Sequence, residues 1–159
     1  MILRLYTEAD KADFIELFTD EAVMKHVGDG VLTTGQAEAF WRKLFEQLYP
    51  HNFNIWAVFA KENSEYVGHA GIYPRQLKPE DWEFVYFLSQ KHWGKGYATE
   101  IAGCIIRFSF EELNLSEVFA TVDDVHSDSI RVLEKAGMKF ERFEYDDEGR
   151  FSVYSIRKD

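Results

Sequence analysis

The spacing of apolar residues switches between two and about 3.6 along the chain, which predicts a mixture of strands and helices. Strand spacing is found in residues 2–6, 53–60, 66–73, 82–89, 118–122, 138–145 and 151–156. Helical spacing is found in residues 10–18, 34–48, 97–113 and 127–136. This order predicts a layered α/β fold, in which helices flank a central, mostly antiparallel twisted sheet. With no repeats or linkers, residues 1–159 are expected to form a single domain.

Turn and cap signals support several of these boundaries. Ser127 or Asp128 can cap the helix that follows, and Gly137 is suited to the position just after its end. Residues 27–30 and 146–149 are rich in glycine and aspartate and are expected to form turns.

The segment between the fourth predicted strand and the third predicted helix carries the strongest chemical signal. It reads Trp93-Gly94-Lys95-Gly96-Tyr97-Ala98-Thr99. Glycine allows tight turns and close approach of a ligand to the backbone. The first amides of the following helix lack intrahelical partners, and with the helix dipole they favour an anion. Together with the charge of Lys95, this predicts a phosphate or pyrophosphate site.

Two common phosphate loops fit this segment poorly. A Walker loop needs Ser or Thr after its lysine, whereas Lys95 is followed by glycine. A dinucleotide fingerprint needs a third glycine where Thr99 stands, and no early βαβ unit surrounds it. A nucleotide-binding module remains as an alternative of another class.

A third loop, that of the GNAT acyltransferases, agrees better. Residues 93–98 resemble its pattern Arg/Gln-x-x-Gly-x-Gly/Ala, with Trp93 in the first position, and look most like the branch of ribosomal-protein N-terminal acetyltransferases. Residues 120–138 resemble a second GNAT segment and match its Ser129 and Glu134-Lys135-x-Gly137, but His126 stands where the family usually has asparagine. Residues 3–10 resemble the family's opening, so the resemblance covers essentially the whole chain.

The resemblance implies transfer of an acetyl group from acetyl-coenzyme A to a primary amine, by direct attack and without a covalent enzyme intermediate. The pantetheine arm would pair with the backbone of the preceding strand, and the pyrophosphate would lie on the glycine loop. The cofactor-binding residues implied are Phe87, Leu88, Ser89, Trp93, Gly94, Lys95, Gly96, Tyr97, Ala98, Thr99, His126 and Ser129. The acceptor stays open between a protein N-terminus, a polyamine, an amino-sugar antibiotic and a small metabolite amine, as does the oligomeric state. A non-catalytic coenzyme A sensor or degenerate relative is the nearest alternative function.

Catalytic roles follow from the same resemblance. Glu83 is the preferred general base, because a carboxylate within an apolar strand can have a raised pKa and act through water. Ser129 is the preferred donor of a proton to the departing thiolate, and Tyr154 is the alternative. His126 can replace asparagine toward the cofactor arm, since a neutral imidazole offers one donor and one acceptor. Trp93 is expected to pack beside the loop.

Composition restricts the partners. The formal net charge of −10 argues against a nucleic-acid partner, because phosphate neutralisation dominates such affinity. No apolar run approaches the length of a membrane span, and no cysteine or histidine spacing suggests a metal site. One cysteine, Cys104, and the lack of a signal-peptide pattern lead us to expect a cytoplasmic protein.

Overall fold

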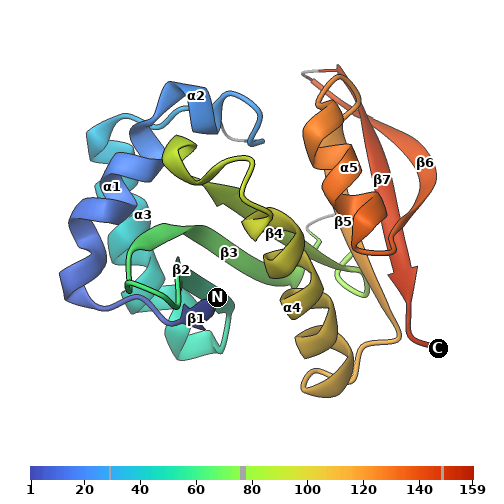
Figure 1. Ribbon diagram of the computed structural model, residues 1–159, viewed down its shortest axis with the longest axis horizontal. Coiled ribbons are helices and arrows are strands. Elements are labelled where there is room, and N and C mark those ends of the chain that lie inside the picture. The colour runs from blue at the N-terminus through green and yellow to red at the C-terminus, as the bar shows by residue number, and fades with distance from the viewer. Residues whose placement is uncertain (29, 76–77, 148) are drawn as a thin grey trace. The chain divides into compact units, whose positions relative to one another are not determined.

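The computed structural model describes residues 1–28, 30–75, 78–147 and 149–159 (Figure 1). Within these residues, seven strands form one sheet in the order β1-β2-β3-β4-β5-β7-β6. The strands are β1 (Ile2–Arg4), β2 (Asn54–Phe59), β3 (Tyr66–Pro74), β4 (Trp82–Leu88), β5 (Glu117–Asp123), β6 (Lys139–Asp146) and β7 (Gly149–Arg157). β1 pairs antiparallel with β2, and β7 pairs antiparallel with both β5 and β6, whereas β4 and β5 are parallel. The predicted α/β fold with a flanked sheet is confirmed.

The helices also follow the predicted order. They are α1 (Lys11–Thr19), α2 (Glu21–Met24), α3 (Thr34–Lys43), α4 (Tyr97–Glu111) and α5 (Ser127–Lys135). Two expectations need correction. The second predicted helix is α-helical only as far as Lys43 and continues as a π-helical turn over Leu44–Leu48, and the short α2 was not expected. In the two predicted turns, Asp29 and Glu148 lie outside the described residues.

The described chain divides into two compact units. The first contains Met1–Gly71 and Tyr86–Tyr97, and the second contains Ile72–Val85 and Ala98–Asp159. The division passes through β3, β4 and the start of α4, so each unit is described by itself. The expectation of a single domain stays a prediction.

The first unit has an aromatic core that also contains a hydrogen-bonded pair of tyrosine hydroxyls. Phe14 and Phe18 of α1 and Trp41 of α3 are buried, and the ring of Tyr6 meets Phe14 edge-on with the ring centroids 5.2 Å apart. The Tyr6 hydroxyl lies 2.9 Å from that of Tyr66. Since buried polar groups require partners, this contact satisfies two hydroxyls that would otherwise be costly to bury.

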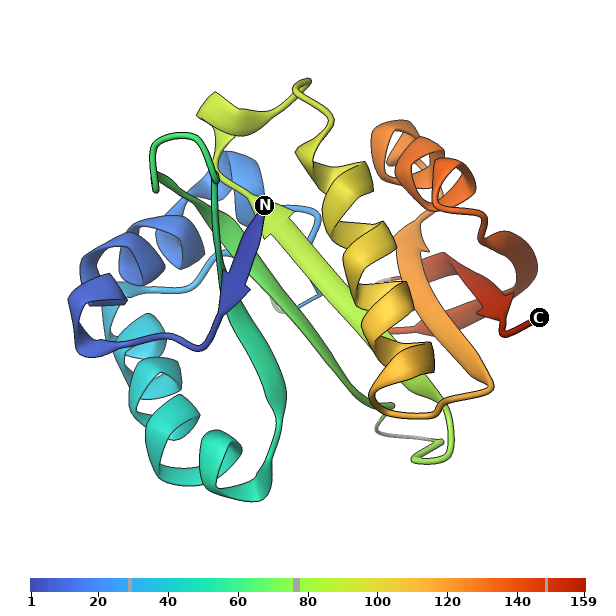
Figure 2. The same cartoon turned by 60° about the horizontal axis from the view of Figure 1, so that its bottom comes forward.

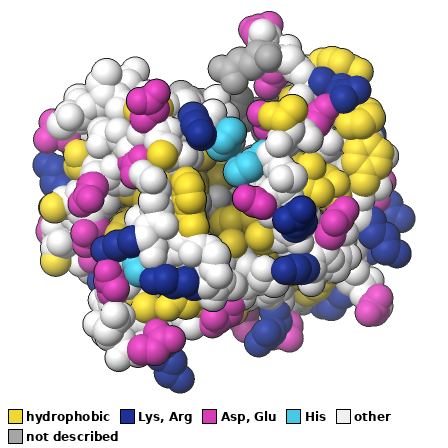
Figure 3. Space-filling model, turned by 45° about the horizontal axis from the view of Figure 1, so that its top comes forward, with side chains coloured by type: hydrophobic (Ala, Val, Ile, Leu, Met, Phe, Trp, Pro, Cys, Tyr) yellow, Lys and Arg dark blue, Asp and Glu magenta, His cyan; other side chains and the backbone are white. Residues whose placement is uncertain are grey.

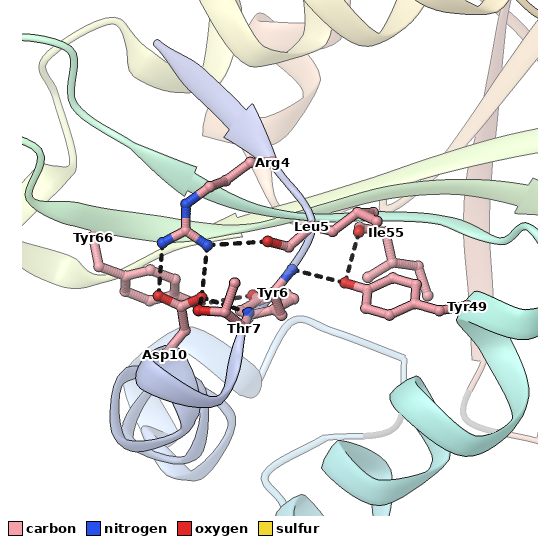
Figure 4. Close-up of polar contacts among 8 residues, drawn as sticks. All are labelled: Arg4, Leu5, Tyr6, Thr7, Asp10, Tyr49, Ile55 and Tyr66. Atoms are coloured by element: carbon pink, nitrogen blue, oxygen red, sulfur yellow. Dashed lines mark hydrogen bonds and ion pairs between the residues drawn. The ribbon is translucent and has the colours of Figure 1, made fainter.

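An ion pair fixes the beginning of the chain (Figure 4). Arg4 donates to both oxygens of Asp10, at 2.7 and 2.9 Å, and the backbone and hydroxyl of Thr7 donate to the same carboxylate. Burial alone would raise the pKa of Asp10, but these hydrogen bonds outweigh it and lower the pKa below its usual value. Tyr49 accepts from the backbone of Tyr6 and donates to the carbonyl of Ile55, which joins this segment to β2.

The second unit is built around the β5–β7–β6 ladder. Ala120 of β5 lies opposite Tyr154 of β7, which in turn lies opposite Phe140 of β6. Figure 2 shows these strands in orange and red. Val118 and Val153 are fully buried. Gly137 follows α5 with φ +91°, the left-handed conformation expected of a residue that ends a helix.

Candidate active site

The glycine loop has the backbone geometry that its sequence predicts. Gly94 and Gly96 have φ angles of +71° and +82°, a region that side chains other than glycine enter at a cost. A Cβ atom built on either glycine would meet no atom within 4 Å, so the space beside both is open. The loop runs directly into α4, which begins at Tyr97, and Lys95 between the glycines is exposed.

At the end of β4, the backbone groups of Phe87, Leu88 and Ser89 do not all point to the same edge of the strand. The amide of Ser89 donates to the carbonyl of Val67 at 3.0 Å, and the carbonyl of Phe87 faces Gly68, where an added Cβ would lie 2.3 Å from it. Because backbone groups of successive strand residues point to opposite edges, Leu88 directs its amide and carbonyl away from β3. Of the three residues expected to pair with a pantetheine arm, Leu88 is therefore the one whose backbone groups point to the edge of β4 that faces away from β3.

Trp93 differs from the expectation of simple packing. The residue is 50% exposed, yet its indole Nε1 donates a hydrogen bond of 2.9 Å to the carbonyl of Leu88. The loop is thereby attached to the end of β4 through a side chain.

His92 is a buried residue of this segment that the sequence analysis did not single out. It is 3% exposed, and its Nε2 donates to the carbonyl of Tyr66 at 3.2 Å. Nδ1 has no hydrogen-bond partner among the described residues. Burial lowers the pKa of His92, and the nearby carboxylate of Glu65 partly opposes this effect. The ring of His92 lies 5.8 Å from that of Tyr97, the first residue of α4.

A small cavity beside the same segment lies within the first unit. It is lined by Asp13, Glu16, Leu17, Asp20, Tyr66, Ser89 and Lys91. Its volume of about 40 Å³ corresponds to a few water molecules, so it does not accommodate an acceptor as large as an amino sugar.

In the second unit, Glu83 lies among polar partners, not in the apolar surroundings expected. The Thr121 hydroxyl donates to its Oε1, and Arg75 Nε lies 3.3 Å from its Oε2. Arg75 also contacts Glu144 at 2.6 Å, and Arg142 contacts Glu144 at 2.6 Å. A carboxylate has about four acceptor positions, so Glu83 keeps acceptor capacity for a water or an amine. Its role as general base stays a prediction.

The other predicted residues of this unit fall into two places. At the start of α5, Ser129 Oγ and His126 Nδ1 share a hydrogen bond of 3.0 Å, and both side chains are half-buried. Tyr154 is buried, with its ring 5.9 Å from that of Phe140. Burial, and to a smaller extent Glu134, raises the pKa of Tyr154, which makes it a weaker acid.

The predicted site residues thus divide between the units. The first holds the strand end and the loop as far as Tyr97, and the second holds Ala98 and Thr99 of α4 with the residues given catalytic roles. The structure brings Ser129 to His126 and Trp93 to Leu88. In the described part of the chain, no group of three or more His, Cys, Asp or Glu side chains is arranged to hold a metal ion. None of the described helices is both long and apolar enough to cross a membrane.

Comparison with known proteins assigns the family. A family model described as an acetyltransferase (GNAT) domain matches residues 1–139. The chain belongs to the GNAT acetyltransferase family. The resemblance inferred from the two GNAT motifs is confirmed, whereas membership of the ribosomal-protein branch stays a prediction.

Relatives and solved structures agree with this assignment. The chain is 31% identical to the Bacillus subtilis (strain 168) protein YkkB over 144 residues, which are 88% of this chain and 82% of that protein. It is 29% identical to the N-acetyltransferase YnaD of the same organism over 143 residues, covering 90% and 81% of the two chains. A GNAT-family acetyltransferase from Bacillus anthracis superposes with a TM-score of 0.83 at 25% identity, covering 98% of this chain and 93% of that one.

Other GNAT structures with this fold have been solved with their cofactor. A spermidine N-acetyltransferase from Vibrio cholerae, in complex with CoA and spermine, has a TM-score of 0.82 at 16% identity, with 98% and 94% of the chains covered. An aminoglycoside acetyltransferase in complex with coenzyme A has a TM-score of 0.79 at 18% identity, with coverage of 98% and 94%. At these low sequence identities, the similarity shows that the fold is shared and no more.

Proposed function

We propose that the chain is an acetyl-CoA-dependent N-acetyltransferase that transfers the acetyl group to a primary amine by direct attack on the thioester. The observation that carries this proposal is the loop of Gly94 and Gly96, both at positive φ, running into the N-terminus of α4 in a chain of the GNAT family. Backbone amides and the helix dipole at such a place favour a pyrophosphate. Lys95 adds one mobile positive charge.

The chemistry needs a proton acceptor for the amine and a proton donor for the leaving thiolate. Glu83 is the proposed acceptor, with Thr121 and Arg75 fixing the direction of its carboxylate. Ser129 is the proposed donor, and its bond to His126 offers a route by which the hydroxyl can recover a proton. Tyr154 is the alternative donor, and burial raises its pKa.

The acceptor is proposed to be a cationic amine. Among the structures with this fold are a spermidine N-acetyltransferase solved with CoA and spermine and an aminoglycoside acetyltransferase solved with coenzyme A. In addition, the net charge of −10 attracts cations. Acidic and basic side chains are interspersed on the face shown in Figure 3, so that face does not gather the negative charge in one patch.

The deciding experiment is an amine panel with acetyl-CoA and detection of the free thiol. The panel contains polyamines, amino-sugar antibiotics, peptides with free N-termini and small metabolite amines. We expect turnover with at least one class and a thermal shift with acetyl-CoA that NAD and ATP do not match. A thermal shift without turnover on any amine would support a non-catalytic coenzyme A binder, and a larger shift with NAD would support a nucleotide-binding module.

Glu83→Gln tests the mechanism once an acceptor is found. General-base catalysis contributes about 10²–10⁴-fold, so turnover should fall by that order while acetyl-CoA affinity stays close to the parent's. The loss should shrink at high pH, where the free amine needs no base. Glu144→Gln is the matched control, because it also removes a charge next to Arg75 without removing the proposed base. Equal losses in the two variants would show that the effect acts through Arg75 and would exclude the base role.

A further inference from the structure

The bond between Trp93 and Leu88 joins two parts of the chain that a coenzyme A molecule would contact separately. The indole Nε1 lies 2.9 Å from the Leu88 carbonyl oxygen. This hydrogen bond links the two ends of the segment that contains the short 3-10 helix Gln90–His92. Trp93 is 50% exposed, so burial alone does not hold its side chain in place. The hydrogen bond is the directional contact that does.

Leu88 is the residue at which this attachment matters most. Ser89 is already bonded to Val67 of β3, so a ligand pairing with the end of β4 must use the opposite edge, toward which Leu88 points. A carbonyl oxygen has two lone pairs, and it can therefore accept from the indole and from a ligand amide together.

We propose that Trp93 is a positioning residue, which fixes the phosphate-binding loop relative to the strand edge that binds the pantetheine arm. This inference rests on the proposed function, because it assigns Trp93 a part in binding acetyl-CoA. A loop already held in its bound conformation loses less conformational freedom when the ligand arrives, and affinity rises accordingly.

The replacement of the family's usual arginine or glutamine agrees with such a role. The indole Nε1 donates a hydrogen bond and cannot accept one, and in this respect it resembles the N–H groups of arginine and glutamine. Trp93 therefore keeps a hydrogen-bond donor at this position while removing charge and flexibility.

The test uses the whole chain and two substitutions. Trp93→Phe keeps an aromatic ring and removes the donor, whereas Trp93→Gln removes the ring and keeps a donor. Titration calorimetry measures the affinity of each protein for acetyl-CoA and for 3′-phosphoadenosine 5′-diphosphate, which has the diphosphate but no pantetheine arm. Thermal melts without ligand check that the variants are folded.

We expect Trp93→Phe to bind acetyl-CoA about 2- to 12-fold more weakly, the effect of one lost hydrogen bond. The diphosphate probe should weaken as well, because the loop itself is less well placed. Trp93→Gln should bind more tightly than Trp93→Phe, and with an active acceptor the KM for acetyl-CoA should rise more than kcat falls.

Two outcomes would overturn the inference. Unchanged affinity in Trp93→Phe would mean that the bond positions nothing, and tighter binding of acetyl-CoA alone would mean that the indole competes with the pantetheine arm for Leu88. Failure of the parent protein to bind acetyl-CoA would instead refute the proposed function, before any variant is measured.

Discussion

The buried His69 should make the stability of the chain depend on pH between pH 7 and pH 5, above the range in which most carboxylates titrate. The residue is 3% exposed, and its ring packs against the rings of Phe18 and Phe87, with centroid distances of 5.0 and 4.9 Å. Nδ1 shares a hydrogen bond of 3.0 Å with the hydroxyl of Tyr6. Burial lowers the pKa of His69 to about 3, compared with an ordinary value of about 6.5.

The sign and size of the effect follow from these two values. Between about pH 6.5 and pH 3 the unfolded chain binds a proton at His69 and the folded chain does not, so the free energy of unfolding falls as the pH falls. From pH 7 to pH 5, this one residue should lower the free energy of unfolding by about 2 kcal/mol.

Urea unfolding of the parent and of His69→Phe at the two pH values measures this contribution. Phenylalanine suits the aromatic surroundings and does not titrate, so the difference between pH 7 and pH 5 should be about 2 kcal/mol smaller in the variant. Comparing differences removes the constant cost of replacing the ring. Leu17→Ala, which truncates a buried side chain without removing a titrating group, should keep the parent's difference. If His69→Phe also keeps it, His69 is protonated in the folded chain and the reasoning is wrong.

Two glycine substitutions test the site geometry. A Cβ at Gly68 would lie 2.3 Å from the carbonyl oxygen of Phe87 and 2.9 Å from the Cα of Leu88, so Gly68→Ala should lower the free energy of unfolding by about 1–3 kcal/mol and weaken acetyl-CoA binding. Gly71→Ala, whose nearest contact would be 3.3 Å, is its control in urea unfolding, and an equally stable Gly68→Ala would contradict the close approach. Gly96→Val should fold, with a loss of about 1–3 kcal/mol from its positive φ, and should lose acetyl-CoA binding in calorimetry. Gly103→Ala, in open space on α4, should bind like the parent, and binding by a folded Gly96→Val would exclude the loop as the phosphate site.

Most of the fold can be predicted from apolar spacing because its long elements repeat that spacing several times. Apolar spacing does not reveal α2, because a helix of four residues is too short to show a period. Its one local signal is Asp20, whose side chain accepts from the amide of Ala22. The change to a π-helical turn at Leu44 leaves the apolar pattern nearly the same, so spacing alone does not reveal it.

The sequence predicts which loop is the candidate site, but it does not predict the contacts of that loop. The glycine loop is a local motif, and its positive φ angles follow from residue type. Which of Phe87, Leu88 and Ser89 points to which edge depends on strand register, because a shift of one residue reverses all three. The surroundings of Glu83 depend on Thr121, which is 38 positions away, and on the side chain of Arg75 after β3.

The charge distribution explains why backbone geometry has such weight in this chain. An anionic cofactor must bind to a protein of net charge −10, and the position where the family usually has arginine or glutamine holds the uncharged Trp93. Within the loop, Lys95 is the cation, and it is exposed, where solvent and salt screen its attraction. In the proposed site, the greater part of phosphate binding would then come from amides held in a fixed arrangement by Gly94, Gly96 and the start of α4. A site of this kind depends on how rigidly its loop is attached, and the role proposed for the hydrogen bond from Trp93 to Leu88 is to strengthen that attachment.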